Sequence, residues 1–384
     1  MYEIVIYDRV SSYCLYDDVI DARKHKQIEP GSHIYVPDLD ITFIVVGPGK
    51  WVLTGERKGI DLKTALHYLN GDKKQEKITA KVANIIYGFN EEYPDIIAQY
   101  PGVLVDVEQD VQIYAYYVPN SNQYDIYFLG NDTIYSPKNS KKLYANMTAL
   151  KTVDTHNYDV SRVANMESLF DYCGSLVSVD TSAWNLSNVT TMAYAFYDCK
   201  NLTELNSTNW SLKNNRSLHM TFYGCSKLSK LDVSKWNTKN ITTLYSTFFR
   251  CKALTSLDVS NWNTSSITTF GHAFTGCSNI QLLDVSKWNT KKATSLLQTF
   301  KECSKLETLD VSNWDVSNVV DMNWVFANCT NLNNINLNKW NTSNVNRMEC
   351  LFFMCSSLTS LDLSKWNVSN VTSMAYMFAG CLNL

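Results

Sequence analysis

The sequence predicts an α/β fold in which short coils, each of one strand and one short helix, stack into a solenoid behind a small α+β region. The prediction rests on three residue types that recur every 26 positions in one phase. The tryptophans are Trp184, Trp210, Trp236, Trp262, Trp288, Trp314, Trp340 and Trp366, with Tyr158 one period earlier. The phenylalanines are Phe170, Phe196, Phe222, Phe248, Phe274, Phe300, Phe326, Phe352 and Phe378. The cysteines are Cys173, Cys199, Cys225, Cys251, Cys277, Cys303, Cys329, Cys355 and Cys381. Such a fixed period is typical of stacked repeats, in which each unit buries its apolar side chains against its neighbours.

One repeat unit, residues 254–279, divides into two halves. The first half follows the pattern LxxLxVxxW, which is strand spacing with apolar side chains pointing inward. Its inward positions are Leu254, Leu257, Val259 and Trp262. The second half has apolar residues separated by three, four and three positions, which predicts one face of a short helix. These residues are Ile267, Phe270, Phe274 and Cys277. Asn or Ser before the helix, as at Ser187, Asn188 and Asn318, is expected to cap its first turn.

The cysteine series predicts a column of small buried thiols, because free cysteine packs as a compact hydrophobe. Disulfides or a metal site are the alternatives. Only Cys14 and Cys350 lie outside the series, and no CxxC pair, the spacing typical of zinc sites, occurs. We therefore expect no metal.

The repeat LDVSxWNTSNVTxMxxxFxxCxxL resembles the BspA-type leucine-rich repeat of bacterial surface proteins. The resemblance covers about residues 140–384, with complete repeats from Asp154. It implies a leucine-rich-repeat-like right-handed solenoid used in adhesion or other protein contacts on cell envelopes, and it implies no enzyme. The chain departs from the usual pattern because it shows neither a signal peptide nor a wall anchor.

Residues 1–135 share nothing with the repeat and predict a small α+β domain for attachment or assembly. An N-terminal cap of the array is expected at 136–153 and the repeat solenoid at 154–384. Strands are predicted over 2–8, 32–37, 41–46 and 50–53, and helices over 62–69 and 77–89. The segments 111–118 and 124–130 flank the turn-rich PNSNQ and predict a hairpin. This hairpin either joins the N-terminal domain or forms a platform for the first coil.

Within this region, EPGSHIYVPDLDITFIVVGPGKWVL (29–53) resembles a short β-rich segment of phage tail and head-attached proteins, and an ordinary β-meander is the alternative. The first residues lack the basic and then apolar stretches of a secretory signal. No window approaches the ~20 apolar residues of a membrane span. Cytoplasmic synthesis and release by lysis are therefore expected, with the virion or an extracellular surface as the location.

Composition and motifs argue against nucleic-acid binding and against an active site. The formal net charge is −3, and no run of Lys and Arg reaches the density of a nucleic-acid groove. The segment GPGK at 47–50 is too short for a phosphate loop and predicts a turn. The six histidines share no repeat position and no HExxH motif, and are predicted to be surface or packing residues: His25, His33, His67, His156, His219 and His272. We expect a protein that is not an enzyme and holds no cofactor.

One polar series provides candidate binding residues, because it lies between the two inward apolar residues of each strand. It comprises Asp154, Asp180, Asn206, Asp232, Asp258, Asp284, Asp310, Asn336 and Asp362. Each should point outward, about 5 Å from its equivalent in the next coil. The lysines available to offset the repulsion are Lys235, Lys287, Lys339 and Lys365.

Two interpretations of this series stay open. In the local one, each Asp accepts hydrogen bonds from the adjoining turn. In the functional one, a polar strip meets a protein, a glycan or a cation, with these residues in contact: Asp232, Asp258, Asp284 and Asp310. A second series, after the tryptophans, is predicted to form turn hydrogen bonds between coils: Asn185, Asn237, Asn263, Asn289, Asn341 and Asn367.

The sequence thus predicts a non-enzymatic binding or adhesion protein. An N-terminal attachment domain carries a repeat solenoid that contacts a protein or glycan on a host or cell surface, in the setting of a phage virion. The alternatives are a structural or decoration protein of a larger particle and a bacterial cell-surface adhesin. Leu384 is the first strand position of an uncompleted coil, so a homo-oligomer or another virion or surface protein is expected to cover the last layer.

Overall fold

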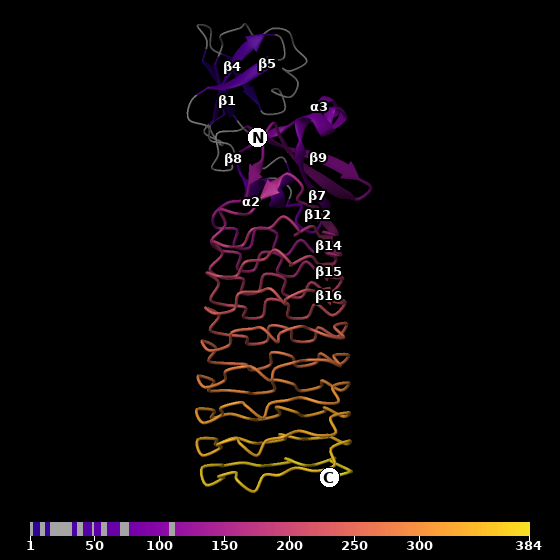
Figure 1. Ribbon diagram of the computed structural model, residues 1–384. Helices are drawn as coiled ribbons and strands as arrows, with labels where there is room; N and C mark the ends of the chain where they lie inside the picture. Colours follow the sequence, from indigo (N-terminus) through magenta and orange to yellow (C-terminus); the bar gives the residue numbers. More distant parts are fainter. Residues whose placement is uncertain are drawn as a thin grey trace.

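A computed structural model of the chain describes residues 3–7, 12–15, 33–36, 41–47, 50–54, 60–69, 77–106 and 112–384, with side-chain burial from residue 61 onward. Figure 1 shows a tall stack of coils whose first layers adjoin the strands of the N-terminal part. His25 lies outside the described residues, and Cys14 and His33 are described by their backbone only. The longest helices in the described part have six residues each. They are far shorter than the ~20 residues that a membrane span needs.

Five strands near the N-terminus form an antiparallel sheet in the order β2-β1-β3-β4-β5. They are β1 (Glu3–Tyr7), β2 (Ser12–Leu15), β3 (His33–Val36), β4 (Ile41–Gly47) and β5 (Lys50–Thr54). The four strands predicted in this stretch are confirmed, and β2 is an addition. Gly47 pairs with Lys50 across the antiparallel strands β4 and β5, while Pro48 and Gly49 of the predicted turn lie outside the described residues.

A second sheet of seven strands, in the order β14-β12-β7-β10-β9-β8-β6, continues from the N-terminal part into the repeats. Its strands are β6 (Ile60–Asp61), β7 (Val82–Phe89), β8 (Val103–Asp106), β9 (Ile113–Asn120), β10 (Gln123–Gly130), β12 (Thr152–Asp154) and β14 (Ser178–Val179). The hairpin β9–β10 is confirmed, and it joins the N-terminal part. β7 pairs in parallel with β10 on one side and with β12 on the other, where Val153 lies opposite Ile85.

The helix predicted over residues 77–89 is wrong, because Val82–Phe89 form β7. Buried Ile85 and Tyr87 flank the half-buried Ile86, which is the alternation of a strand. β-Branched and aromatic residues favour a strand when neighbours are available on both edges, and this tertiary pairing overrides a helical spacing. The other predicted helix is confirmed as α2 (Leu62–His67). Two short helices were not predicted, η2 (Asn90–Glu92) and α3 (Pro94–Gln99).

The short helix predicted in every coil is also wrong. From residue 112 onward the chain contains only short strands, isolated β-bridges and turns. The remaining strands are β11 (Ile134–Tyr135), β13 (Tyr158–Asp159), β15 (Glu204–Leu205) and β16 (Lys230–Leu231). Where the helix was expected, turns close within the coil, as from Cys277 N–H to the Phe274 carbonyl (3.0 Å). Alternate amides donate to the next coil, as from Phe274 N–H to the Thr299 carbonyl (2.9 Å).

A left-handed backbone conformation recurs one and five residues before each cysteine and explains this correction. In the coil that ends at Cys277, His272 has φ 57° and Gly276 has φ 75°. A left-handed residue interrupts a right-handed helix and costs roughly 1 kcal/mol or more outside glycine. The His272 N–H instead donates to the Leu297 carbonyl of the next coil at 2.7 Å. The spacing of three, four and three therefore comes from successive turns.

The predicted helix caps consequently have other roles. The side-chain amides of Asn188 and Asn318 each donate to a backbone carbonyl of the preceding coil at 2.8 Å. The Ser187 backbone N–H donates to Asn185 Oδ1 at 3.1 Å. Asn188 and Asn318 therefore connect neighbouring coils and do not cap a helix.

The repeated aromatic side chains form columns in the interior. The tryptophans from Trp184 to Trp340 are at most 4 % exposed, and the phenylalanines from Phe170 to Phe326 are fully buried. Within each column the rings stack, as for Trp262 on Trp288 (centroids 6.3 Å apart, 3° between planes). The two columns also touch, since the Phe274 and Trp288 centroids are 6.2 Å apart. The two halves of each coil therefore face each other across one continuous core.

The aromatic core extends beyond the first repeat into the N-terminal part. Phe170 stacks on Tyr144 at 4.7 Å. The Tyr144 and Tyr87 hydroxyls are hydrogen bonded at 2.7 Å. The Tyr87 ring lies between Tyr158 (4.0 Å) and Phe128 (5.0 Å). β7 and β10 thus cover the first end of the array with their own aromatic side chains.

Candidate functional site

The aspartate series is exposed on the strand side of the coils. From Asp180 onward, each carboxylate of the series accepts hydrogen bonds from the serine two residues later, whereas Asp154 accepts from His156. For Asp232, the Ser234 backbone N–H and hydroxyl both reach Oδ1, at 3.0 and 2.6 Å. The same pair of bonds occurs at Asp258, Asp284, Asp310 and Asp362. This is the local interaction by which Asp closes a turn.

These hydrogen bonds lower the pKa of four carboxylates of the series, Asp232, Asp284, Asp310 and Asp362. The Ser234 hydroxyl and then its backbone N–H lower the pKa of Asp232, and the charge of Lys235 adds to them. At Asp310 the serine bonds again dominate, and the neighbouring charge of Asp284 partly opposes the lowered pKa. In the described part of the chain, the lysines beside the tryptophans form no ion pair with the series and act through space.

A groove of about 820 Å³ runs along the strand side near the start of the array. Its charged lining residues are Asp180, Glu204, Lys230, Asp232 and Asp258. Four carboxylates and one ammonium give this lining a net charge of −3, and Lys230 pairs with Glu204 at 3.1 Å. The groove brings together two residues of the predicted strip, while Asp284 and Asp310 lie outside its lining.

The asparagines that follow the tryptophans were predicted to form hydrogen bonds between coils. Their side chains do not do so. Asn263 Oδ1 accepts the Ser265 backbone N–H at 3.1 Å, inside its own turn. Its backbone carbonyl makes the contact between coils by accepting the Thr238 hydroxyl at 3.1 Å. At this position the asparagine side-chain oxygen accepts the N–H two residues on, the local turn interaction typical of Asn and Asp.

The turn segments carry an aromatic strip that the sequence analysis missed. The aromatic strip is Tyr172, Tyr194, Tyr197, His219, Tyr223, Tyr245, Phe249 and His272. Tyr172 is 47 % exposed, and the other seven side chains are half-buried. The phenylalanine column on the same segments points inward against the tryptophans. The aromatic strip therefore lies on the other side of the core from the groove lined by Asp180, Asp232 and Asp258, called the acidic groove below.

Ring contacts make the aromatic strip continuous across five coils. Tyr223 stacks on Tyr197 at 4.7 Å and on Phe249 at 4.4 Å, with planes 11° and 5° apart. The Tyr194 hydroxyl lies 3.0 Å from His219 Nε2. Burial lowers the pKa of His219 and that of His272, so both imidazoles are neutral at pH 7. The strip is therefore uncharged, with hydroxyl and imidazole groups among aromatic rings.

The signal for this strip was present in the sequence. Tyr197, Tyr223 and Phe249 each lie two residues before a repeat cysteine, and His219 and Tyr245 lie six residues before one. These positions face outward only because the segment is a series of turns with left-handed residues. The helical interpretation gave no reason to group them.

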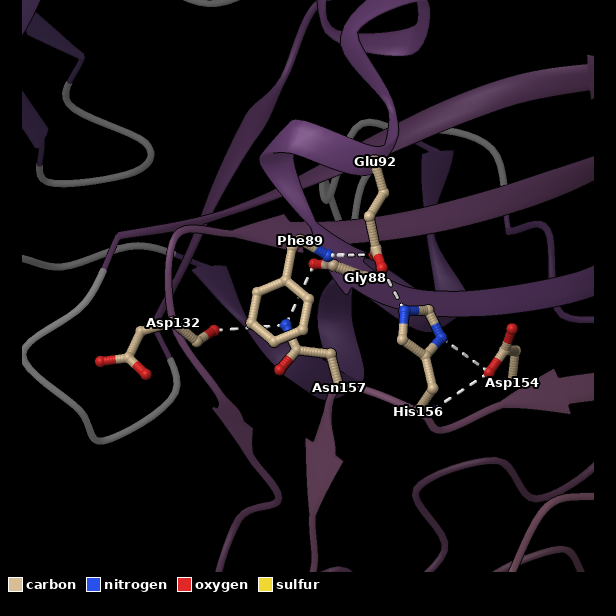
Figure 2. A network of polar contacts seen from close by, with 7 residues as sticks. All are labelled: Gly88, Phe89, Glu92, Asp132, Asp154, His156 and Asn157. Atoms are coloured by element: carbon tan, nitrogen blue, oxygen red, sulfur yellow. Dashed lines mark hydrogen bonds and ion pairs between the residues drawn. The ribbon is translucent and has the colours of Figure 1, made fainter.

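Figure 2 shows a polar network where the N-terminal part meets the first coil. His156 Nδ1 lies 2.9 Å from Asp154 Oδ1, and its Nε2 lies 2.9 Å from Glu92 Oε2. The same Glu92 oxygen accepts the Phe89 backbone N–H at 2.8 Å. The side-chain amide of Asn157 donates to two carbonyls of the N-terminal part at 3.2 and 3.3 Å. The imidazole therefore links η2 to β12.

The network predicts a pH-dependent stability. Burial lowers the pKa of His156, but the hydrogen bonds and charges of Glu92 and Asp154 outweigh it and raise the pKa above 6.5. The His156 hydrogen bond, and then the Phe89 N–H, lower the pKa of Glu92 below 4.5. The stability contributed by His156 is present below pH 6.5 and is lost as the pH rises through the pKa of His156 in the folded protein. The stability contributed by Glu92 is present above pH 4.5 and is lost as the pH falls through the pKa of Glu92 in the folded protein.

We expect the stabilisation by this network to be largest between pH 4.5 and 6.5. Above this window, the difference in melting temperature between the wild type and His156→Gln should shrink by about 1 to 2 °C. The effect is small because the His156 side chain is 34 % exposed and solvent screens its charge. Thermal unfolding from about pH 4 to about pH 8 measures the difference. Parallel pH profiles for the two proteins would contradict the assignment.

The repeat thiols are free and face the interior. Each donates to a carbonyl of the preceding coil, as Cys251 Sγ does to Phe222 O at 3.1 Å. Burial raises the pKa of Cys277 to about 12 and that of Cys355 to about 12, so these thiols are protonated at pH 7. Within the described residues, no group of three or more His, Cys, Asp or Glu side chains is arranged to hold a metal ion.

Comparison with known proteins gives one family. No curated protein and no solved structure matches the chain. The model of the family described as "Mycoplasma protein of unknown function, DUF285" matches three overlapping stretches, residues 138–231, 216–308 and 294–384. These stretches together cover the whole repeat array and well over half of the chain. The chain therefore belongs to the DUF285 family of tandem-repeat proteins.

Proposed function

We propose that the protein is a non-enzymatic binding protein whose repeats form a leucine-rich-repeat-like, right-handed solenoid of BspA type. Tandem repeats, a mostly sheet-like backbone and coil-to-coil hydrogen bonds support this architecture. The observation that carries the binding role is the aromatic strip. Tyrosine and other aromatic residues are enriched where proteins contact partners, since they bring large contact areas with few rotatable bonds.

The coil itself does not require aromatic residues in the strip. The column of Tyr197, Tyr223 and Phe249 continues in later coils as Thr275, Lys301 and Ala327. These later coils keep the same turns, left-handed residues and inter-coil hydrogen bonds. The aromatic character of the first part of the column is therefore best explained by a contact outside the chain.

The chemistry of the strip favours a protein partner over a glycan. The rings of Tyr197, Tyr223 and Phe249 stack on one another, so they cover their own faces and present their edges and the two tyrosine hydroxyls. A sugar would need an exposed ring face, whereas a protein surface can pack against edges and exchange hydrogen bonds with hydroxyls. The partner would lie on a host or cell surface, with the N-terminal part attaching the array to a virion or a bacterial envelope. A structural or decorating role in a larger particle is the alternative.

Binding to arrays of purified surface proteins and of glycans tests the proposal. The strip variant is Tyr197→Thr, Tyr223→Thr and Phe249→Thr, which introduces the residue that the chain itself has at Thr275. The control variant changes the strand side instead: Asp232→Asn, Asp258→Asn and Asp284→Asn. We expect the strip variant to lose at least about tenfold in affinity for a protein ligand, or ~1.4 kcal/mol, with the control unchanged.

Other outcomes would redirect the proposal. If only the aspartate variant loses binding, the acidic groove is the contact surface. If glycans bind and the strip variant abolishes it, the protein preference is wrong. Absence of any ligand, together with stable incorporation into purified particles, would favour the decorating role.

A further inference from the structure

A second cavity, of about 360 Å³, opens where α2 meets the first turns of the array. Lysines from three segments line it: Lys63 from α2, Lys77 from the bridge that pairs with Tyr68, and Lys142 from the turn before the first full repeat. All three side chains are exposed at its rim. Its size is at the lower end of small-molecule sites.

The charges of this cavity are unbalanced. Among the lining residues that the structure describes, three ammonium groups face one carboxylate, Asp61, a net charge of +2. Both Asp61 oxygens are already hydrogen bonded to Thr64, Oδ1 to its N–H at 2.9 Å and Oδ2 to its hydroxyl at 2.6 Å. Among the described residues no acidic side chain forms an ion pair with any of the three lysines. The adjacent Lys141, by contrast, pairs with Glu167 at 2.9 Å.

A buried histidine fixes the floor of the cavity. His67 is 8 % exposed, and its ring is held between Thr79 Oγ1 (3.2 Å) and the Leu143 carbonyl (2.9 Å). Because a carbonyl can only accept, Nε2 carries the proton and Nδ1 accepts from the threonine. Burial is the main cause that lowers the pKa of His67, and the charges of Lys63 and Lys77 lower it further. The floor of the cavity is therefore neutral and held by two hydrogen bonds. The positive charges of Lys63 and Lys77 both reach it.

We propose that this cavity binds a phosphate group, either as free orthophosphate or as the terminal phosphate of a small molecule. Lysine binds phosphate as a point charge, while planar carboxylates are better matched by the two-pronged guanidinium of arginine, and no arginine is among the described residues of this lining. Bound phosphate would offset the repulsion among the lysines. It would also connect α2 to the turn that carries Lys142 and Asn146, and so stabilise the junction.

Titration calorimetry of the full chain with orthophosphate, pyrophosphate and glycerol phosphate, each against sodium chloride of equal ionic strength, tests this site. We expect saturable binding at one site per chain. The variant Lys63→Gln, Lys77→Gln and Lys142→Gln should weaken it at least about tenfold, or ~1.4 kcal/mol. The matched control is Lys227→Gln, Lys252→Gln and Lys305→Gln, which removes three exposed lysines of the repeats and should leave binding unchanged.

Protection of lysines from acetylation gives a second readout that does not depend on a variant. Phosphate should protect Lys63, Lys77 and Lys142 and leave Lys227 reactive. Preference for the free anion or for glycerol phosphate identifies which source fits the cavity. Equal weakening by both triple variants, or protection spread over all lysines, would show diffuse charge attraction and overturn the proposal. Absence of saturable binding to all three anions would overturn it as well.

Discussion

Replacing Trp288 by alanine is expected to lower the free energy of unfolding of the array by about 3 to 5 kcal/mol, as for other buried aromatic residues. The side chain is 2 % exposed, and its ring lies between Trp262 (6.3 Å) and Trp314 (6.0 Å). Its Nε1 also donates to the Val259 carbonyl at 3.2 Å. The substitution therefore opens a cavity lined by three coils and removes one of the two donors to the Val259 carbonyl, which keeps the Trp262 backbone N–H at 3.1 Å.

The measurement has to report on the site of the loss, because stacked repeats do not unfold as a single unit. Hydrogen exchange should accelerate first in the amides of the coils on either side of Trp288, and the denaturation midpoint should fall. Lys287→Ala is the control, since that neighbouring side chain is exposed. A Trp288→Ala protein with wild-type exchange in these coils would show that the column does not carry the stability assigned to it.

Replacing Tyr87 by alanine should weaken the junction between β7 and the first coil of the array. We expect the free energy of unfolding to fall by about 3 to 5 kcal/mol. The ring is fully buried between Tyr158 and Phe128, and its hydroxyl is bonded to that of Tyr144 at 2.7 Å. The backbone of the same strand pairs with β12. Loss of the ring removes the aromatic contact that joins the two parts.

The variant Tyr87→Phe separates the contribution of the stacked ring from that of the hydroxyl hydrogen bond. It keeps the ring and removes one hydroxyl, so it should cost only about 0.5 to 1.5 kcal/mol, the range for one net hydrogen bond, because Tyr158 is also a hydrogen-bond partner of the Tyr144 hydroxyl. Limited proteolysis should detect cleavage near the junction in Tyr87→Ala and much less in Tyr87→Phe. Equal loss in both variants would place the stability in the hydrogen bond and not in the stacked rings.

The period of 26 residues was enough to predict the columns of the core. The rings at Trp288 and Phe274 lie in one interior because identical positions of identical coils stack. The conformation of the second half could not be predicted in the same way. Left-handed residues such as His272 and Glu302 carry ordinary side chains, so their backbone is set by hydrogen bonds to the next coil and not by residue type.

The surfaces were harder to predict than the core. The local interpretation of Asp232 followed from the tendency of Asp to accept hydrogen bonds from an adjoining turn, whereas the aromatic strip depended on knowing which side chains face outward from the turns. The lysine cavity could not be predicted, because Lys63, Lys77 and Lys142 lie far apart in the sequence and meet only through the folding of α2 onto the first turns. β7 was mistaken for a helix because its partner strands are distant in the chain.

The hydrogen bonds between coils have a consequence for how such genes can change. Because each unit presents the same donors above and the same acceptors below, removal or duplication of a whole unit rejoins equivalent surfaces and alters the height of the stack by about 4.8 Å. A gain or loss of one residue would break that equivalence. Recombination that joins equivalent positions of two units would therefore lengthen or shorten the protein in whole steps while leaving every remaining layer intact.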